Sequence, residues 1–249
     1  MLTPSGTLWL AAATAGPAAV IAHLGLPDTI MKRGGSPITR GDSSVERGGS
    51  PIERGGSFGT LRETWRVNRV LLGGRTTRGL LLAVWLPIAM SVGAEGVLVP
   101  YATGLGQAGS AGLILAAAAI GMGLGNFVVG RLVPAGLRPR LTLPLALLTG
   151  LPLLFFVLGP GLVAACLLML ATTCGLSYEL TVQRRLADAV PMKIQGQAMG
   201  LANTGLMTGQ ALGIAAAGAL AEFAAPGRVI AICGAAAIAV SLALYRYLR

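Results

Sequence analysis

The sequence is poor in the residues from which catalytic and metal sites are built. It has one histidine, three cysteines and only nine aspartate or glutamate residues among 249. The cysteines form no Cys-x-x-Cys pair and no cluster with the histidine, so neither a metal site nor a disulfide framework is indicated. A nucleophile and its base would need such side chains to converge. We therefore expect no enzyme activity, no metal and no cofactor.

Charge is also scarce. Only 11% of the residues are charged, whereas a soluble domain has about 25%. The net charge of +10 does not indicate a nucleic-acid partner, because the basic residues are neither interleaved with aromatic residues nor grouped on one domain. They fall in short breaks between long apolar stretches. This pattern predicts an all-α, polytopic transmembrane helical bundle whose main partner is the lipid bilayer.

Windows of about 19 residues identify seven candidate membrane spans. A span needs about 20 apolar residues to cross roughly 30 Å of hydrocarbon. The first candidate is the weakest, since it is rich in alanine and contains Pro17 and His23. No basic residue precedes Lys32, so the charged start of a cleaved signal peptide is missing. The seven candidates are Thr7–Leu26, Gly79–Ala102, Gln107–Gly130, Leu141–Leu158, Gly161–Leu180, Gly196–Phe223 and Gly227–Tyr247.

The basic residues predict the orientation of these spans. Eighteen of the nineteen lysines and arginines fall on one side of the predicted membrane, and only Arg228 falls on the other. The positive-inside rule places the eighteen in the cytoplasm, together with the C-terminus. We expect a multi-pass protein of the inner or plasma membrane, divided into a weak first helix (1–26), a basic cytoplasmic linker (27–78) and a six-helix bundle (79–249).

The linker contains a repeated motif. Arg33–Ile38 reads RGGSPI, Arg47–Ile52 repeats it, and Arg54–Ser57 begins a third copy. Glycine, serine and proline with alternating charge cannot bury enough apolar area to order a chain. A flexible tether is the favoured interpretation, although Arg-Gly-Gly tracts also contact RNA. Beyond the repeats, Leu61–Leu72 has the pattern of an amphipathic helix at a membrane surface.

Two glutamates are candidates for function inside the membrane. Glu95 lies well inside its span, where a carboxylate is costly and usually faces a cavity or a partner. It is a candidate for proton coupling or substrate binding, or a protonated carboxyl bonded to a neighbouring helix. Glu179 is expected near the cytoplasmic end of its span, where Arg131 or Arg184 could pair with it to form a cytoplasmic gate.

Small and polar residues predict how the helices meet. Glycines at four-residue spacing allow helices to approach closely. Asn203 and Gln210 could line a polar path for substrate or protons, or could form interhelical hydrogen bonds. Pro87, Pro100, Pro144 and Pro152 are expected to kink or loosen the second and fourth of the seven spans. The glycines expected in helix packing are Gly121, Gly125, Gly205, Gly209 and Gly213.

Two stretches resemble a known family of transporters. Gly125–Pro134 (GNFVVGRLVP), followed by Arg138 and Arg140, is similar to the glycine–arginine loop that the major facilitator superfamily places between the second and third helices of each half. Val190–Leu201 (VPMKIQGQAMGL) resembles that family's loop into its eleventh helix. The departures are Gly130 where the family has aspartate, and Gln195 where arginine is typical.

The resemblance covers the last helix of the first half, the central loop and the final six helices of such a transporter. It implies secondary active transport, and the apolar spans suggest proton-coupled efflux of a small amphipathic compound. Five helices of the first half are missing, so the chain is expected to be a truncated half that could pair with a second one. The alternative is a non-transporting, truncated or accessory membrane protein that docks on another transporter half.

Overall fold

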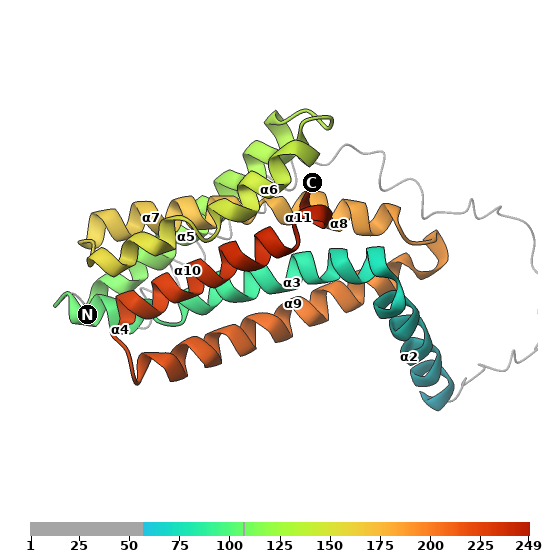
Figure 1. The fold of residues 1–249 in the computed structure, drawn as a ribbon, viewed down its shortest axis with the longest axis horizontal. Coiled ribbons are helices and arrows are strands. Elements are labelled where there is room, and N and C mark those ends of the chain that lie inside the picture. Colours follow the sequence, from blue (N-terminus) through green and yellow to red (C-terminus); the bar gives the residue numbers. More distant parts are fainter. Residues whose placement is uncertain (1–56, 107) are drawn as a thin grey trace, which may run out of the picture. The chain divides into compact units, whose positions relative to one another are not determined.

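The computed structural model describes residues 57–106 and 108–249, and every regular element in these ranges is a helix. Short turns separate them, and several pairs of helices follow each other along a single span (Figure 1). The elements are α2 (Ser57–Gly73), α3 (Arg75–Glu95), α4 (Leu98–Gly104), η2 (Ala108–Ser110), α5 (Ala111–Phe127), η3 (Val128–Leu132), α6 (Arg138–Leu148), η4 (Pro152–Leu158), α7 (Leu162–Gly175), α8 (Tyr178–Asp188), α9 (Met192–Ala221), α10 (Pro226–Ala243) and α11 (Tyr245–Leu248).

Six stretches of the described helices are long and apolar enough to cross a membrane. Each overlaps one of the last six predicted spans, so the prediction of an all-helical, membrane-embedded bundle is confirmed over these residues. The first candidate, Thr7–Leu26, and the RGGSPI repeats lie outside the described residues. The six spans are Arg75–Gly104, Ala111–Leu132, Arg138–Leu158, Leu162–Asp188, Met192–Ala221 and Pro226–Ala243.

One predicted span ends earlier than the helix that contains it. The sequence places the end of the fourth of these spans at Leu180, whereas the helix continues as α8 to Asp188. The second half of α8 carries polar and charged side chains, which lower the local hydropathy although the backbone stays helical. As a result, Glu179 lies nine residues before the end of this helix.

The six spans fall into two groups of three in chain order, residues 75–158 and residues 162–243, and the two groups make matching contacts. α3 packs most extensively on α9, and α5 packs to a similar extent on α7. α10 packs on α3, just as the α6–η4 span packs on α7 and α8, and these two outer spans contact each other. Each group crosses the bundle three times. Because three is odd, the first span of the second group runs in the opposite direction to the first span of the first group. The bundle therefore has the arrangement of an inverted repeat.

The helix α2 corresponds to the amphipathic segment predicted at Leu61–Leu72. Its inner side packs on α3 and α9, where Leu71 is buried and Gln197 of α9 donates a hydrogen bond to the Thr64 carbonyl (3.0 Å). Its outer side exposes Trp65 and Val70. In Figure 1, α2 leaves the bundle at a steep angle to α3.

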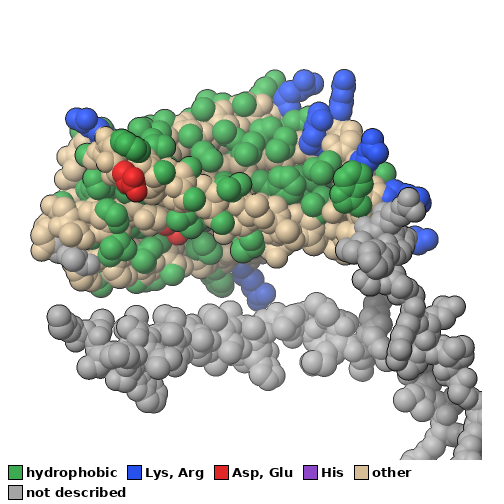
Figure 2. All heavy atoms as spheres, turned by 90° about the horizontal axis from the view of Figure 1, so that it is seen from below, with side chains coloured by type: hydrophobic (Ala, Val, Ile, Leu, Met, Phe, Trp, Pro, Cys, Tyr) green, Lys and Arg blue, Asp and Glu red, His purple; other side chains and the backbone are tan. Residues whose placement is uncertain are grey.

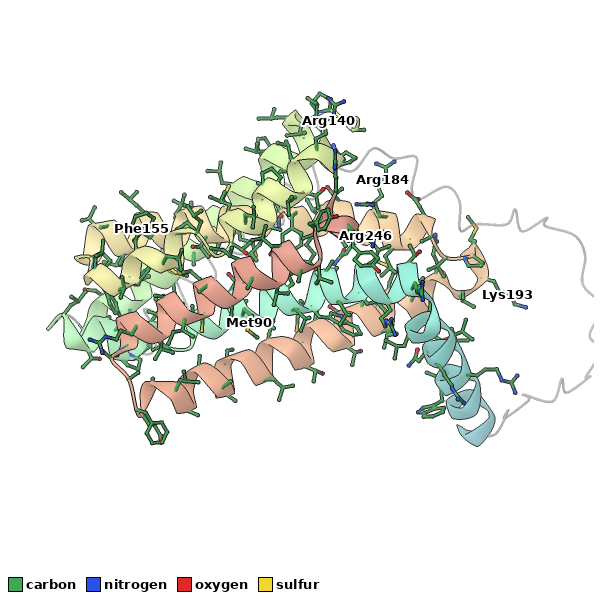
Figure 3. All side chains as sticks on the ribbon, viewed as in Figure 1. Met90, Arg140, Phe155, Arg184, Lys193 and Arg246 are labelled. Carbon is green, nitrogen blue, oxygen red and sulfur yellow. The ribbon has the colours of Figure 1, made fainter. Side chains whose placement is uncertain are left out.

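The surface of the bundle is divided by chemical type along its length. Figure 2 shows hydrophobic side chains over the middle of this face and most of the lysine and arginine side chains at one end, with single ones at the other end and at the lower edge. Large apolar residues such as Phe155, Leu158 and Val163 are half or more exposed, and Figure 3 shows Phe155 pointing away from the helices. An apolar exposed belt with charged ends is the surface that a bilayer requires.

Two prolines leave backbone carbonyls without their usual helical donors, and hydroxyl groups of neighbouring helices replace those donors. Pro87 has no amide hydrogen to give to the Ala83 carbonyl, and the buried Tyr178 hydroxyl donates to that oxygen (2.9 Å). Ser91 likewise donates to the Thr149 carbonyl (3.2 Å) ahead of Pro152, where η4 begins. These bonds tie α3 to α8 and to the α6–η4 span.

Candidate functional site

The first carboxylate inside the membrane lies at a break in its helix. The break is a short tightened turn, in which Gly96 keeps helical dihedral angles and Val97 bonds back only three residues to Ala94. Glu95 is the last residue of α3, and Gly96 and Val97 form a turn before α4 begins. Its side chain is half-buried and has no hydrogen bond or ion pair within the part of the chain that the structure describes. A carboxyl group in this position is costly in a bilayer unless water or a ligand reaches it.

The second carboxylate lies just beyond a similar break. Leu176 and Ser177 form the turn between α7 and α8, and Glu179 is the second residue of α8. The Gln183 side chain donates a hydrogen bond to its Oε1 atom (2.5 Å), and the carboxylate is half-buried. Both breaks interrupt the first span of a group of three, so they occupy corresponding places in the inverted repeat.

The two glutamates lie on opposite sides of the middle of the bundle. Each is about two-thirds of the way along its span of 30 or 27 residues, and these spans run in opposite directions. The Tyr178 hydroxyl bonds to Ala83, which precedes Glu95 by 12 residues on α3. The two carboxylates therefore lie at different levels along the bundle.

A buried hydroxyl without a partner lies at the level of Glu95. Thr172 on α7 is 1% exposed, and its Oγ1 has no hydrogen-bond partner among the described residues. It precedes Gly175 by three residues, and Gly175 packs against Thr149. Ser91, four residues before Glu95, bonds to the same Thr149. An unpaired buried donor is unfavourable. At this level of the bundle, polar groups are therefore present and at least one of them lacks a hydrogen-bond partner among the described residues.

The predicted gate residues are not brought together as an ion pair. Arg131 is exposed at the end of η3, Arg184 is exposed on α8, and neither pairs with Glu179 in residues 57–106 and 108–249. Arg184 is five residues after Glu179, and such side chains point to different sides of a helix. It lines a cleft of about 210 Å³ with Arg138 and Asp188. The ion pair expected for the gate is therefore not formed among these residues, and the gate role of Arg131, Glu179 and Arg184 stays a prediction.

The polar residues predicted on α9 lie on its uncovered side. Asn203 is exposed and Gln210 is partly exposed, and their spacing of seven residues places them on one face. Neither makes a hydrogen bond within the described ranges, so the interhelical bonds considered for them are not formed there. Thr208, also exposed, bonds to the Thr204 carbonyl of its own helix (2.9 Å). α9 is the least buried of the six spans.

The predicted glycines lie where helices approach most closely. A Cβ atom at Gly121 or Gly125 of α5 would overlap backbone carbonyl oxygens of α7. On α9, a Cβ at Gly213 would overlap the carbonyl oxygen of Ala89, and one at Gly205 would overlap the Trp85 ring on α3. Gly209 has more room, because its Cβ would meet Ala89 at 3.4 Å. The close contacts thus recur in the two most extensive helix pairs.

Sequence reasoning missed Tyr178, which links the two groups of helices beside Glu179. The ring is fully buried and its hydroxyl satisfies the carbonyl that Pro87 leaves free. The available signal was the proline four residues after Ala83, which requires an outside donor at that depth. Identifying the donor, however, needs the three-dimensional pairing of α3 with α8.

The described residues hold no group of three or more histidine, cysteine, aspartate or glutamate side chains that could bind a metal ion. The three cysteines are free thiols. No protein-family model, curated protein or solved structure matches the chain. Inferences about function therefore depend on the chain's own residues and geometry.

Proposed function

We propose that this chain is part of a secondary active transporter of the major facilitator type, which exports a small amphipathic compound in exchange for protons. One observation carries the proposal. Glu95 and Glu179 lie beside breaks in corresponding spans of an inverted repeat. Transporters commonly combine inverted repeats with interrupted helices that form the binding site.

The two carboxylates are assigned alternating roles in proton exchange. Glu95 lies nearer the end opposite the basic cluster and Glu179 nearer the basic end, so each is suited to exchange protons with a different side. A carboxyl group in the membrane that has water access can bind a proton or a cationic substrate. Asn203 and Gln210 on the open face of α9 are assigned to the polar path between the two sides.

The open face of α9 is the proposed contact with a second transporter half. Alternating access in this class of protein requires two groups of helices that move about a shared site. Among the described helices only α3 covers α9 extensively, and the exposed polar side chains of Asn203 and Thr204 suit a hydrated cavity better than a lipid surface. An accessory protein that uses this face only for docking is the competing proposal.

The proposed transport is tested by reconstituting the full chain in liposomes that contain an impermeant pH dye. With an acidic lumen and a neutral exterior, addition of ethidium or related amphipathic cations should make the lumen alkaline faster than in protein-free vesicles. The expected reason is exchange of lumenal protons for the cation. A folded protein that gives no cation-dependent proton movement with any compound of the panel would contradict transport and favour the accessory role.

We further propose that the protein lies in the plasma or inner membrane and that the basic end of the bundle faces the cytoplasm. The test uses single cysteines at Ser110, the last residue of η2 before α5, and at Gly136, in the turn before α6, after alanine replaces the native cysteines. An impermeant maleimide should label the Ser110 variant in intact cells and the Gly136 variant only in opened cells. The reverse pattern would show that the orientation inferred from the charges is wrong.

A further inference from the structure

An arginine-lined cavity lies at the basic end of the bundle. It has a volume of about 810 Å³, which is within the usual size range of ligand sites. Its walls come from three separate places in the chain: the start of α3, the end of α8 and the short helix α11. The lining residues are Arg75, Thr76, Arg78, Leu80, Arg185, Asp188, Ala189, Arg246 and Tyr247.

The wall that carries Arg246 is firmly attached to the bundle. Leu248 of α11 is fully buried in the core, and a Cβ atom at Gly79 of α3 would overlap the Tyr247 ring. Arg185 reaches across from α8 and donates to the backbone oxygens of Tyr247 and Arg249, both at 2.9 Å. The cavity is therefore formed by packed elements, and Arg246 is held opposite the start of α3.

The cavity has an excess of positive charge. Four arginines line it against a single aspartate, Asp188. Arg75, Arg78 and Arg246 are exposed and have no hydrogen bond or ion pair within the described part of the chain. Like charges gathered in one cleft repel each other, whereas an anion with several oxygen atoms can accept hydrogen bonds from more than one guanidinium group.

The position of the cavity favours a lipid over a dissolved anion. It lies where two spans, Arg75–Gly104 and Leu162–Asp188, have their polar ends, which is the depth of the headgroup layer. Nearby α11 exposes Tyr245, and α2 exposes Trp65. These aromatic residues are typical of the membrane–water interface. A phospholipid at this level could place its phosphate in the cavity while its chains stay along the apolar surface.

We propose that this cavity binds the phosphate headgroup of an anionic phospholipid, with Arg75, Arg78 and Arg246 as the contacting residues. Basic clefts between membrane helices are suited to such headgroups, because the anionic leaflet supplies the ligand at high local concentration. The site is separate from the transport residues, and the proposal requires only that the chain is embedded in a membrane.

The proposal is tested with the purified full chain and its R78Q/R246Q variant. Phosphatidylglycerol retention is measured by native mass spectrometry after delipidation and titration with that lipid in detergent. Two arginines at about 1 kcal/mol each near an anionic surface give an expected loss of affinity of about 30-fold at 1.4 kcal/mol per ten-fold. The R78K/R246K variant keeps the charge and should retain most of the binding.

The matched control is R140Q/K193Q, which removes the same charge from exposed positions outside the cavity. Figure 3 shows Arg140, Lys193 and Arg246 on separate elements. The control should change lipid affinity less than about three-fold, since diffuse charge adds little beyond a Debye length. An equal loss in both double variants would overturn the proposal. So would equally strong retention of phosphatidylcholine, or displacement of the lipid by millimolar inorganic phosphate, which would indicate a site for a dissolved anion.

Discussion

Replacement of Gly213 by alanine should destabilise the bundle, whereas the same replacement at Gly218 of the same helix should not. A Cβ atom at Gly213 would overlap the backbone carbonyl oxygen of Ala89, and nothing lies within 4 Å of one at Gly218. A carbonyl of a packed helix cannot rotate away as a side chain can, so α3 and α9 must separate. Overpacking of this kind costs about 1–3 kcal/mol.

The α5–α7 pair provides an independent copy of this experiment. A Cβ atom at Gly125 of α5 would lie only 2.9 Å from the Cα atom of Cys174, whereas one at Gly123 would meet open space. Gly125→Ala should lower the unfolding free energy in detergent, and Gly123→Ala should leave it unchanged or raise it by up to about 1 kcal/mol. Equal effects at the close and the open glycines would show that helix propensity, and not the contact, decides stability.

Glu95→Gln and Glu179→Gln should each abolish proton-coupled movement of ethidium in the liposome assay while leaving the protein folded. Glutamine has nearly the same shape and resembles the protonated carboxyl group, but it cannot release a proton. Exchange of labelled for unlabelled ethidium at equal pH should persist, because that process needs no net proton transfer. Initial rates of lumenal alkalinisation, measured at a fixed pH gradient, check the prediction.

Glu222→Gln is the matched control, because that carboxylate lies at the end of α9, away from both helix breaks. It should transport as the unmodified protein does. Undiminished coupling in either Glu95→Gln or Glu179→Gln would remove that residue from the proton pathway. Loss of helical content in a variant, measured by circular dichroism, would identify a folding defect, and replacement by aspartate would then test the same position.

Hydropathy and charge predict the six described spans because the bilayer imposes both signals on every crossing helix. The long apolar run that ends at Gly104 predicts a span from its own hydropathy, without knowledge of the helices that pack against it. The two breaks were not predicted. Gly96–Val97 and Leu176–Ser177 are apolar or small residues inside apolar windows, and no proline occupies either turn. Backbone breaks of this kind depend on how neighbouring helices satisfy the freed polar groups.

The sequence predicts individual residues of the candidate site, but it does not predict how those residues are arranged in space. The sequence identifies Glu95 as unusual because a carboxylate is rare in such a span. It ends the helix just after Glu179, because the charged residues of α8 look like a loop in a hydropathy window although they continue the helix. The correspondence between the two glutamates becomes visible only when the pairs α3–α9 and α5–α7 are compared.

Pro87 and Tyr178 restrict the order in which this sequence can change during evolution. While proline occupies position 87, loss of the Tyr178 hydroxyl leaves the Ala83 carbonyl unpaired, at a cost of about 1–3 kcal/mol. Once another residue restores the amide at 87, the same loss becomes nearly neutral. Replacement of Pro87 before Tyr178 therefore avoids this loss of stability, whereas replacement of Tyr178 first incurs it. Lineages that keep the proline should keep the tyrosine for as long as they do.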